Sequence, residues 1–482
     1  MSEHFDVLVV GAGLSGVCAG YYLQTKCPGK SYAILESRGA IGGTWDLFRY
    51  PGVRSDSDMY TLGYSFHPWQ NPKAIADGPA ILDYVQETAV SHHINQHIRF
   101  HHHVTAASWS SATAQWHVTA ERGADKEPVD FTCNFLLLCS GYYDYDQGHA
   151  PSWEGMEEFN GRFIHPQHWP SDLDYTGKRV VVIGSGATAV TLLPAMAEQV
   201  SHITMLQRSP TYIVPGPSED AFANKLHQTF PPKLAHWLAR WKFILQGIYY
   251  FFLARRFPAA TKETILKVAQ DELGADYDVA THLSPRYNPW DQRVCLIPDS
   301  DLFQAIKSGK ASIVTDEIER FTPSGIQLRS GGELPADLII TATGLKVKLM
   351  GGLQLSVDGN PVTLSELITY KGMMYSNVPN FATVFGYTNA SWTLKCELII
   401  GYVCRLLNHM DRRGYSQCTP KLDVLPAATS PAIDLESGYI RRALDRMPRQ
   451  SEKRPWRVYQ NYLIDLFYLG YSGVADGTML FS

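Results

Sequence analysis

The chain has 482 residues, of which 45% are hydrophobic and 18% are charged, and its formal net charge is −5. This length exceeds that of one typical domain, and the composition predicts a globular protein with large cores. Because no basic excess is present to neutralise phosphates, nucleic acid is excluded as the main partner.

The cysteines and the amino terminus indicate the compartment. Eight cysteines are scattered without a C-x-x-C pair, which predicts reduced thiols and excludes a disulfide or zinc framework. The first residues lead directly into a buried-strand pattern, with no basic segment before a signal core. No apolar stretch is long enough to cross a bilayer. These features predict a cytoplasmic protein.

The first predicted element is a strand over Phe5–Val10, followed by Gly11-x-Gly13-x-x-Gly16 and a helical stretch. The next strand ends at Glu36, 20 residues after Gly16. In such a β-α-β unit the first glycine permits a tight turn, and the second lets the backbone approach a pyrophosphate. The third glycine lets the helix pack closely on the strand, and the acid binds ribose hydroxyls. The unit predicts a dinucleotide site.

A second unit begins with a strand over Arg179–Ile183 and continues through a loop of the same kind. Its next strand, His202 to Gln207, is followed by an arginine and a serine where the first unit has an acid. A carboxylate there would repel a 2′-phosphate, whereas these side chains would hold one, so NADPH is favoured over NADH. The candidate NADPH-binding residues are Gly184, Ser185, Gly186, Ala187, Thr188, Ala189, Gln207, Arg208 and Ser209.

Three further motifs carry a resemblance that covers essentially the whole chain. Before the second loop stands Phe159-x-Gly161-x3-His165-x3-Trp169-Pro170, which resembles the fingerprint of Baeyer–Villiger monooxygenases. The segments Arg49 to Tyr60 and Asn288 to Arg293 resemble the ethionamide-activating subgroup of that family. Members insert an oxygen atom from O2 beside a ketone carbonyl, and the fingerprint is expected to join their two cofactor domains.

The resemblance implies FAD at the first site. Gly42-Gly43-Thr44-Trp45 looks like the loop that wraps the flavin, and the strand from Leu338 to Gly344 looks like a late flavin-domain motif. Arg54, Ser55 and Asp56 are expected to touch NADP+ from the flavin domain. The residues expected against FAD are Gly11, Gly13, Ser15, Gly16, Glu36, Gly43, Thr44, Trp45, Asp46, Leu47, Asp56 and Val104.

The predicted fold class is α/β, with two Rossmann-like dinucleotide-binding domains and a helical insertion. A discontinuous FAD-binding domain is expected to comprise residues 1–150 and 341–482. The NADPH-binding domain is expected to comprise residues 151–215 and 288–340. Residues 216–287 have helical composition without strand alternation and form the predicted insertion.

The resemblance also implies the chemistry. NADPH delivers hydride to FAD, reduced flavin adds O2 at C4a, and the resulting peroxide attacks a ketone to give an ester or lactone. Arg293 is the predicted catalytic residue, because a fixed guanidinium stays charged and stabilises both the peroxide and the developing oxyanion. Asp56 is expected to orient Arg293. Sulfides are expected to take oxygen from the same intermediate. No metal is expected.

Two rival functions and one ambiguous segment stay open, whereas a third rival is excluded. A flavin-containing monooxygenase that acts only on nitrogen or sulfur is the nearest rival, and a flavin-bearing regulatory protein is a rival from another class. A disulfide reductase would require a redox cysteine pair, which the chain lacks. The aromatic segment 236–257 is compatible with an interfacial membrane helix, with a wall of a substrate funnel, or with burial in the insertion. The histidines at 92, 93, 97 and 101–103 are interpreted as solvated or packed.

Overall fold

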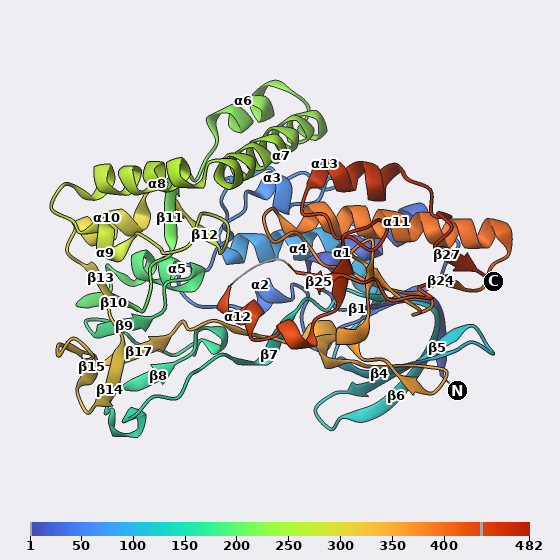
Figure 1. Ribbon diagram of the computed structural model, residues 1–482, viewed down its shortest axis with the longest axis horizontal. Coiled ribbons are helices and arrows are strands. Elements are labelled where there is room, and N and C mark those ends of the chain that lie inside the picture. Colours follow the sequence, from blue (N-terminus) through green and yellow to red (C-terminus); the bar gives the residue numbers. More distant parts are fainter. Residues whose placement is uncertain (1, 434–436) are drawn as a thin grey trace.

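The computed structural model describes residues 2–433 and 437–482. The described residues form two α/β units, with a layer of helices along one edge of both (Figure 1). The unit at the right of the view contains the amino and carboxyl termini, and the unit at the left contains the middle of the chain. This arrangement is the two-dinucleotide-binding fold that the sequence predicts.

The first unit is built on a mixed sheet. Its central strands β1 (Glu3–Val10) and β6 (Glu127–Leu138) are parallel, and their carboxyl-terminal halves, residues 7–10 and 135–138, are apolar and mostly buried, as in a sheet covered on both faces. Helices α1 (Leu14–Lys26), α4 (Gly78–Ser91) and α11 (Trp392–Arg413) contribute to the core that covers one face of this sheet. In spatial order the strands are β20 (Asn360–Pro361), β19 (Gln354–Val357), β4 (His102–Ser110), β5 (Gln115–Arg122), β6 (Glu127–Leu138), β1 (Glu3–Val10), β2 (Tyr32–Leu35) and β3 (Ile98–Arg99), and β23 (Phe381–Thr383) also pairs with β6.

The second unit is a parallel sheet whose neighbouring strands come from distant parts of the chain. Helix α5 (Ala187–Met196) follows β9 directly, and α10 (Asp301–Lys307) packs beside α5. The strand predicted from Leu338 to Gly344 ends at Thr341, and Gly344 lines a cavity at the junction of the two units. In spatial order the strands are β13 (Ala311–Thr315), β10 (His202–Gln207), β9 (Arg179–Ile183), β17 (Leu338–Thr341) and β8 (Arg162–Ile164).

The two connections between the units lie side by side. Strand β7 (Tyr143–Gly148) leads out of the first unit, β18 (Leu345–Val347) leads back into it, and the two pair antiparallel. A small antiparallel sheet covers the outer end of the second unit, with strands β14 (Ile318–Thr322), β15 (Gly325–Leu328) and β16 (Glu333–Pro335). A paired linker of this kind restricts how far one unit moves against the other.

The insertion is helical, as its composition predicts, and it lies between β11 (Tyr212–Gly216) and β12 (Val294–Pro298). Ala223 and Ala239 pack in the core of the first unit, whereas Ala269 and Leu283 pack in that of the second. The insertion therefore bridges both units along the upper edge in Figure 1. Its helices are α6 (Ala221–Thr229), α7 (Pro232–Arg256), α8 (Pro258–Leu273) and α9 (Val279–His282).

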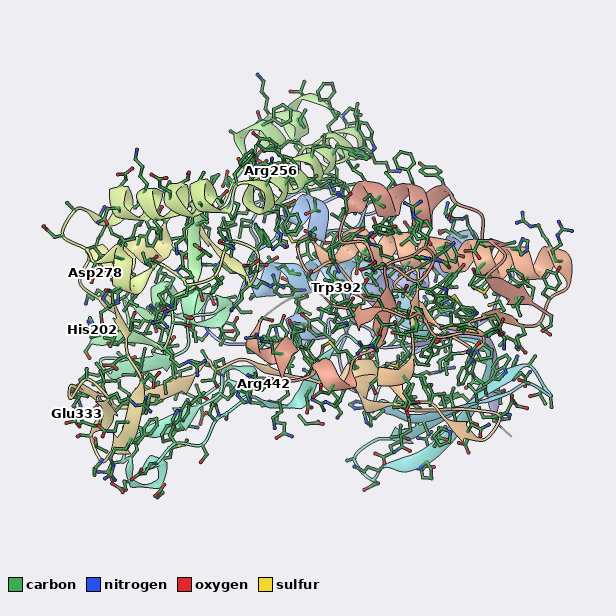
Figure 2. All side chains as sticks on the ribbon, viewed as in Figure 1. His202, Arg256, Asp278, Glu333, Trp392 and Arg442 are labelled. Carbon is green, nitrogen blue, oxygen red and sulfur yellow. The ribbon has the colours of Figure 1, made fainter. Side chains whose placement is uncertain are left out.

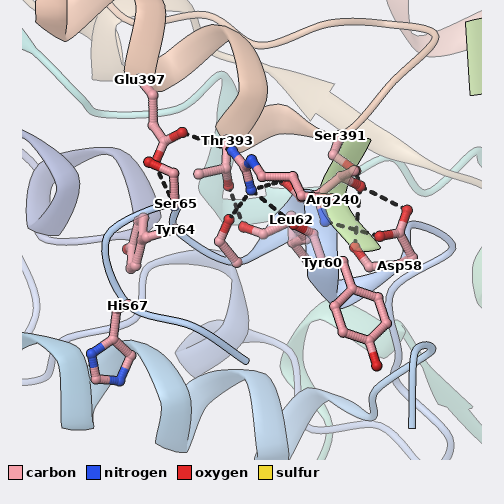
Figure 3. Close-up of polar contacts among 12 residues, drawn as sticks. Asp58, Tyr60, Leu62, Tyr64, Ser65, His67, Arg240, Ser391, Thr393 and Glu397 are labelled. Carbon is pink, nitrogen blue, oxygen red and sulfur yellow. Dashed lines mark hydrogen bonds and ion pairs between the residues drawn. The ribbon is translucent and has the colours of Figure 1, made fainter. Parts of the chain in front are cut away.

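Buried charges fix α7 to the first unit (Figure 3). Arg240 lies on α7, and its Nη2 donates to Oε2 of Glu397 on α11 at 2.7 Å. Its Nη1 donates to the carbonyl oxygens of Tyr60 at 2.9 Å and Gly63 at 2.7 Å, at the short helix α3 (Met59–Leu62). Glu397 in turn accepts from the backbone N–H of Ser65 at 2.7 Å. Since Arg240 and Glu397 expose only 6% and 9% of their side chains, this pair joins the insertion rigidly to α3 and α11.

None of the described helices combines the length and the apolar composition that a bilayer crossing requires. All eight cysteines are buried and carry free thiols.

The carboxyl-terminal region adds short elements around the first unit. These are α12 (Gly438–Arg441), α13 (Tyr462–Asp465), a π-helical segment over Leu466–Tyr471, and two antiparallel strand pairs, β24 (Cys418–Pro420) with β27 (Met479–Phe481) and β25 (Thr429–Pro431) with β26 (Arg449–Ser451).

Candidate active site

Both glycine loops open onto one cavity at the junction of the two units. Its volume is about 1250 Å³. This exceeds the roughly 300–1,000 Å³ of a typical pocket for one small ligand. Trp392, near the middle of the molecule in Figure 2, is part of its wall. The cavity therefore has room for more than one ligand, and its walls come from both units.

The first loop is shaped for a pyrophosphate. Gly11 has a φ of +102°, and a Cβ there would lie 2.6 Å from the carbonyl oxygen of Cys139. A Cβ on Gly16 would lie 1.8 Å from the carbonyl oxygen of Gly11, so only glycine lets α1 pack this closely. The first turn of α1 contains no acidic residue. Its amino-terminal dipole is therefore free to attract an anion in the cavity.

Glu36 lies at the end of β2, buried and on the cavity wall. One carboxylate oxygen accepts from the backbone N–H of Ala12 at 2.7 Å, and the other accepts from that of Arg38 at 2.8 Å. These bonds fix the carboxylate beside the glycine loop and leave lone pairs for ribose hydroxyls. Together with the first loop, Glu36 fits the ribose and pyrophosphate of a dinucleotide such as FAD.

The second loop has the same features. Gly186 has open space on its side-chain face, and the first turn of α5 again contains no acidic residue. The hydroxyl of Ser185 donates to the carbonyl oxygen of Ser209 at 3.0 Å and lies 2.9 Å from the hydroxyl of Thr211. These contacts hold the segment after β10 against the loop, and Arg208 of that segment lines the cavity. The site fits a dinucleotide whose ribose carries a 2′-phosphate.

Arg293 and Asp56 meet in this cavity. Nη1 of Arg293 donates to Oδ2 of Asp56 at 3.0 Å, although 237 residues separate them in sequence. The side chains are 40% and 31% exposed, and both line the cavity. The carboxylate of Asp56 raises the pKa of Arg293 still further above its ordinary value. The cavity therefore contains a guanidinium that is permanently charged and held by one oxygen, with further N–H donors available.

A second ion pair closes the junction beside this one. Arg54 belongs to the first unit, and its Nη1 donates to Oδ2 of Asp301 at the start of α10 at 2.5 Å. Ser55 is buried, and its hydroxyl accepts from the backbone N–H of Ser57 at 2.9 Å. Arg54 and Ser55 also line the cavity. Arg54 thus joins the two units on the side of the cavity where the second loop lies.

Aromatic side chains surround Arg293. The hydroxyls of Tyr142 and Tyr143 lie 2.7 Å apart, and the ring of Tyr142 stacks on Trp392 with centroids 5.7 Å apart. Burial raises the pKa of both tyrosine hydroxyls, so they stay protonated at neutral pH. Tyr439 of α12 faces the same pair. Aromatic rings therefore line the space beside Arg293, which suits an organic substrate.

Most of the residues that the sequence singles out lie on the wall of this cavity. These are Gly11, Gly13, Ser15, Glu36, Gly43, Thr44, Trp45, Arg54, Ser55, Asp56, Val104, Gly184, Ser185, Gly186, Ala187, Thr188, Arg208 and Arg293. Six candidates do not line it: Gly16, Asp46, Leu47, Ala189, Gln207 and Ser209. Among them, Asp46 pairs with Arg38 of the cavity wall at 2.5 Å and with Arg49 at 2.6 Å.

No sequence pattern predicts a role for Tyr142, Tyr143 or Tyr439, and the histidines at 101–103 are predicted only to be solvated or packed. All three histidines line the cavity, and His101, with a φ of +58°, lies immediately before β4. One signal was available for the tyrosines, because Tyr142 and Tyr143 follow the carboxyl end of β6, beside β1. Ligands of open α/β sheets bind at that end of the strands.

The segment Phe159 to Pro170 contacts the linker and lies outside the cavity wall. Nε2 of His165 lies 3.3 Å from the carbonyl oxygen of Gly344, and a Cβ on Gly148 would overlap the imidazole. Burial lowers the pKa of His165, which keeps the ring neutral. The imidazole therefore packs on the start of β18 and the end of β7, where the two units are joined.

Comparisons with known proteins identify the family. Residues 54–244 match the flavin-binding monooxygenase-like family model, and residues 9–85 match an NAD(P)-binding Rossmann-like domain. The chain is 51% identical to the FAD-containing monooxygenase EthA of Mycolicibacterium smegmatis, over 100% of this chain and 98% of that one. It is 46% identical to the probable FAD-binding monooxygenase AlmA of Acinetobacter baylyi, over 100% and 97% of the two chains.

Solved structures share the fold at lower identity. A steroid monooxygenase bound to NADP aligns over 99% of both chains, with a TM-score of 0.76 and 22% identity. OTEMO in complex with FAD and NADP aligns over 87% of this chain and 88% of that one, with a TM-score of 0.71 and 24% identity. Because the chain is 51% identical to EthA over its full length, it belongs to the FAD-containing monooxygenases of the EthA type.

Proposed function

We propose that this protein is a Baeyer–Villiger monooxygenase that uses NADPH and O2 to convert ketones into esters or lactones, and that it also oxidises sulfides. The observation that carries the proposal is the Arg293–Asp56 pair, 3.0 Å apart, on the wall of the cavity that both glycine loops share. The tyrosines beside it line the space for the substrate.

The residues have distinct roles in this proposal. FAD, when bound, accepts hydride from NADPH and activates O2. Arg293 stays charged throughout and donates N–H groups to the oxyanion that develops on the ketone oxygen. Asp56 fixes the orientation of the guanidinium. Arg54 and Ser55 hold the second dinucleotide in place, which keeps water away from the reacting atoms.

The proposal also assigns a cofactor to each domain and a location to the protein. Residues 1–150 and 341–482 bind FAD, residues 151–215 and 288–340 bind NADPH, and residues 216–287 form the insertion that bridges them. Contacts of the insertion with both cores support its place between the two domains. We place the protein in the cytoplasm, where NADPH is available. Any contact with a membrane depends on the exposed surface of α6 and α7.

A ketone and sulfide panel with product identification by mass spectrometry tests the reaction. The expected result is ester or lactone formation that depends on NADPH and O2, with sulfoxides from the sulfides. Sulfoxides or N-oxides without any ester would instead identify an enzyme that acts only on nitrogen or sulfur. A yellow protein that consumes no NADPH with any substrate would support the regulatory alternative.

Arg208→Ala tests the preference for NADPH. Because the substitution removes a guanidinium at the expected place of the 2′-phosphate, the KM for NADPH is expected to rise by about 10- to 100-fold, the loss of one charge-assisted contact. The KM for NADH, which has no 2′-phosphate, should change little. Steady-state kinetics with both cofactors measure this. An equal rise for both would contradict a 2′-phosphate role for Arg208.

A further inference from the structure

Helix α7 presents apolar side chains to solvent as well as to the core. Its inner face buries Ala235, Ala239 and Ile244. The opposite side exposes between 44% and 58% of each of five large apolar residues: Leu234, Trp237, Leu245, Tyr249 and Phe252. Their spacing in sequence puts these five on one side of a helix, the outer face of α7. A surface helix normally carries polar side chains there, so this face is suited to an apolar partner.

Neighbouring elements extend the same surface. Phe222 is 54% exposed on α6, and Phe467 and Tyr471 are 67% and 76% exposed in the π-helical segment after α13. Trp241 of α7 packs edge-on against Tyr462 of α13, with ring centroids 6.2 Å apart. In Figure 1, α6, α7 and α13 lie along the same upper edge of the molecule. Separate parts of the chain therefore contribute exposed aromatic residues to one edge.

The charge of this region differs from that of the rest of the chain. Residues 221–262 contain seven lysines and arginines and no aspartate or glutamate, although the chain as a whole carries −5. Lys225, Lys233 and Arg256 are exposed and form no ion pair with the residues that the structure describes. Exposed tryptophan, tyrosine and phenylalanine beside unpaired basic side chains are typical of helices that lie in the headgroup region of anionic membranes.

We propose that the outer face of α7, together with α6 and residues 464–471, docks on the surface of a bilayer that contains anionic phospholipid. The Arg240–Glu397 pair holds α7 rigidly, so the exposed side chains present a preformed surface (Figure 3). The aromatic rings enter the headgroup region, and Lys225, Lys233 and Arg256 pair with lipid phosphates. No crossing of the bilayer is involved.

The structure also connects this surface with the cavity. Trp241, Ile248 and Tyr462 pack on a buried cluster that contains Tyr387, and Tyr387 lines the cavity. The docking surface and the cavity wall are therefore joined by packed apolar side chains, so we expect an apolar substrate dissolved in the bilayer to enter from this side of the molecule. This last consequence rests on the proposed function, whereas the docking does not.

Co-sedimentation of the full-length holoenzyme with vesicles tests the docking. The probes are vesicles of phosphatidylcholine alone and of phosphatidylcholine mixed with phosphatidylglycerol, at low and high NaCl. Binding is expected with the anionic vesicles only, and high salt is expected to weaken it. Trp237→Ser with Phe252→Ser should lower the binding constant about tenfold or more. Lys233→Gln with Arg256→Gln should lower it several-fold.

A matched control removes exposed apolar side chains elsewhere. Val424 and Leu425 are 80% and 69% exposed, and Val424→Ser with Leu425→Ser should leave vesicle binding unchanged. Flavin absorbance and the thermal midpoint show that each variant is folded. Absence of binding to anionic vesicles, or an equal loss in the control, would overturn the proposal. So would a dimer in light scattering that Trp237→Ser with Phe252→Ser dissociates, because a second copy would then cover the face.

Binding is measured without substrate, so its result is independent of the reaction. Vesicle binding without ester formation would leave the docking intact and reject the proposed function. Ester formation without vesicle binding would support the proposed function and reject the docking.

Discussion

Arg293→Ala is expected to lower the rate of ester formation about 10²- to 10³-fold while the protein still binds FAD and still oxidises NADPH. The guanidinium lies 3.0 Å from Asp56 on the wall shared by both nucleotide loops, and it is the cation that we assign to the developing oxyanion. Loss of one such preorganised donor costs about 3–4 kcal/mol of barrier, or about 10²- to 10³-fold in kcat. Stopped-flow reduction of the flavin and product analysis separate the two steps.

The control for this prediction is a second arginine in a similar pair. Arg320 pairs with Glu158 at 2.6 Å, and these side chains are 41% and 43% exposed, close to the values of the Arg293 pair. Arg320 lies outside the cavity wall, so Arg320→Ala should leave ester formation within about twofold, as is usual for an exposed pair. Ester formation that survives in Arg293→Ala would assign the stabilising role to another group.

The sequence predicts the nucleotide sites well because their features are local. Gly11, Gly16 and Glu36 lie within one β-α-β unit, where spacing alone determines the turn, the helix packing and the position of the acid. The same reasoning predicts Gly184 and Gly186. The Arg293–Asp56 pair joins residues that are far apart in sequence, so it was reached only through the resemblance to a family.

The tyrosines around Arg293 show what the sequence leaves open. Tyr142 follows β6, whereas Tyr439 lies on α12, and their rings meet with centroids 6.4 Å apart. Nothing in the spacing of two aromatic residues almost 300 positions apart distinguishes a cavity wall from ordinary core. Their meeting depends on the pairing of β7 with β18, which is long-range packing. Specificity for the substrate is therefore the property that the sequence predicts least.

The ion pair that stabilises the insertion also could not be predicted from the sequence. Helical composition predicts α7, but an arginine within an aromatic helix gives no sign of its partner. Arg240 proves to be buried against Glu397 of α11, 157 residues away, and against carbonyl groups at α3. This buried pair attaches the insertion to the first unit, so its removal should lower the stability of the fold strongly.

Arg240→Met is expected to lower the free energy of unfolding by about 3–5 kcal/mol, because it leaves the buried carboxylate of Glu397 without its cation. Adding Glu397→Gln should recover part of this loss, since the amide oxygen can still accept from the backbone N–H of Ser65.

Lys30→Met is the control. Lys30 pairs with Asp411, also on α11, at 2.8 Å, and Asp411 is 53% exposed. Its loss should cost no more than about 1 kcal/mol. Denaturant unfolding followed by circular dichroism and flavin fluorescence compares the variants. Equal losses in Arg240→Met and Lys30→Met would mean that water reaches the Arg240 pair and that the insertion is attached mainly by its apolar contacts.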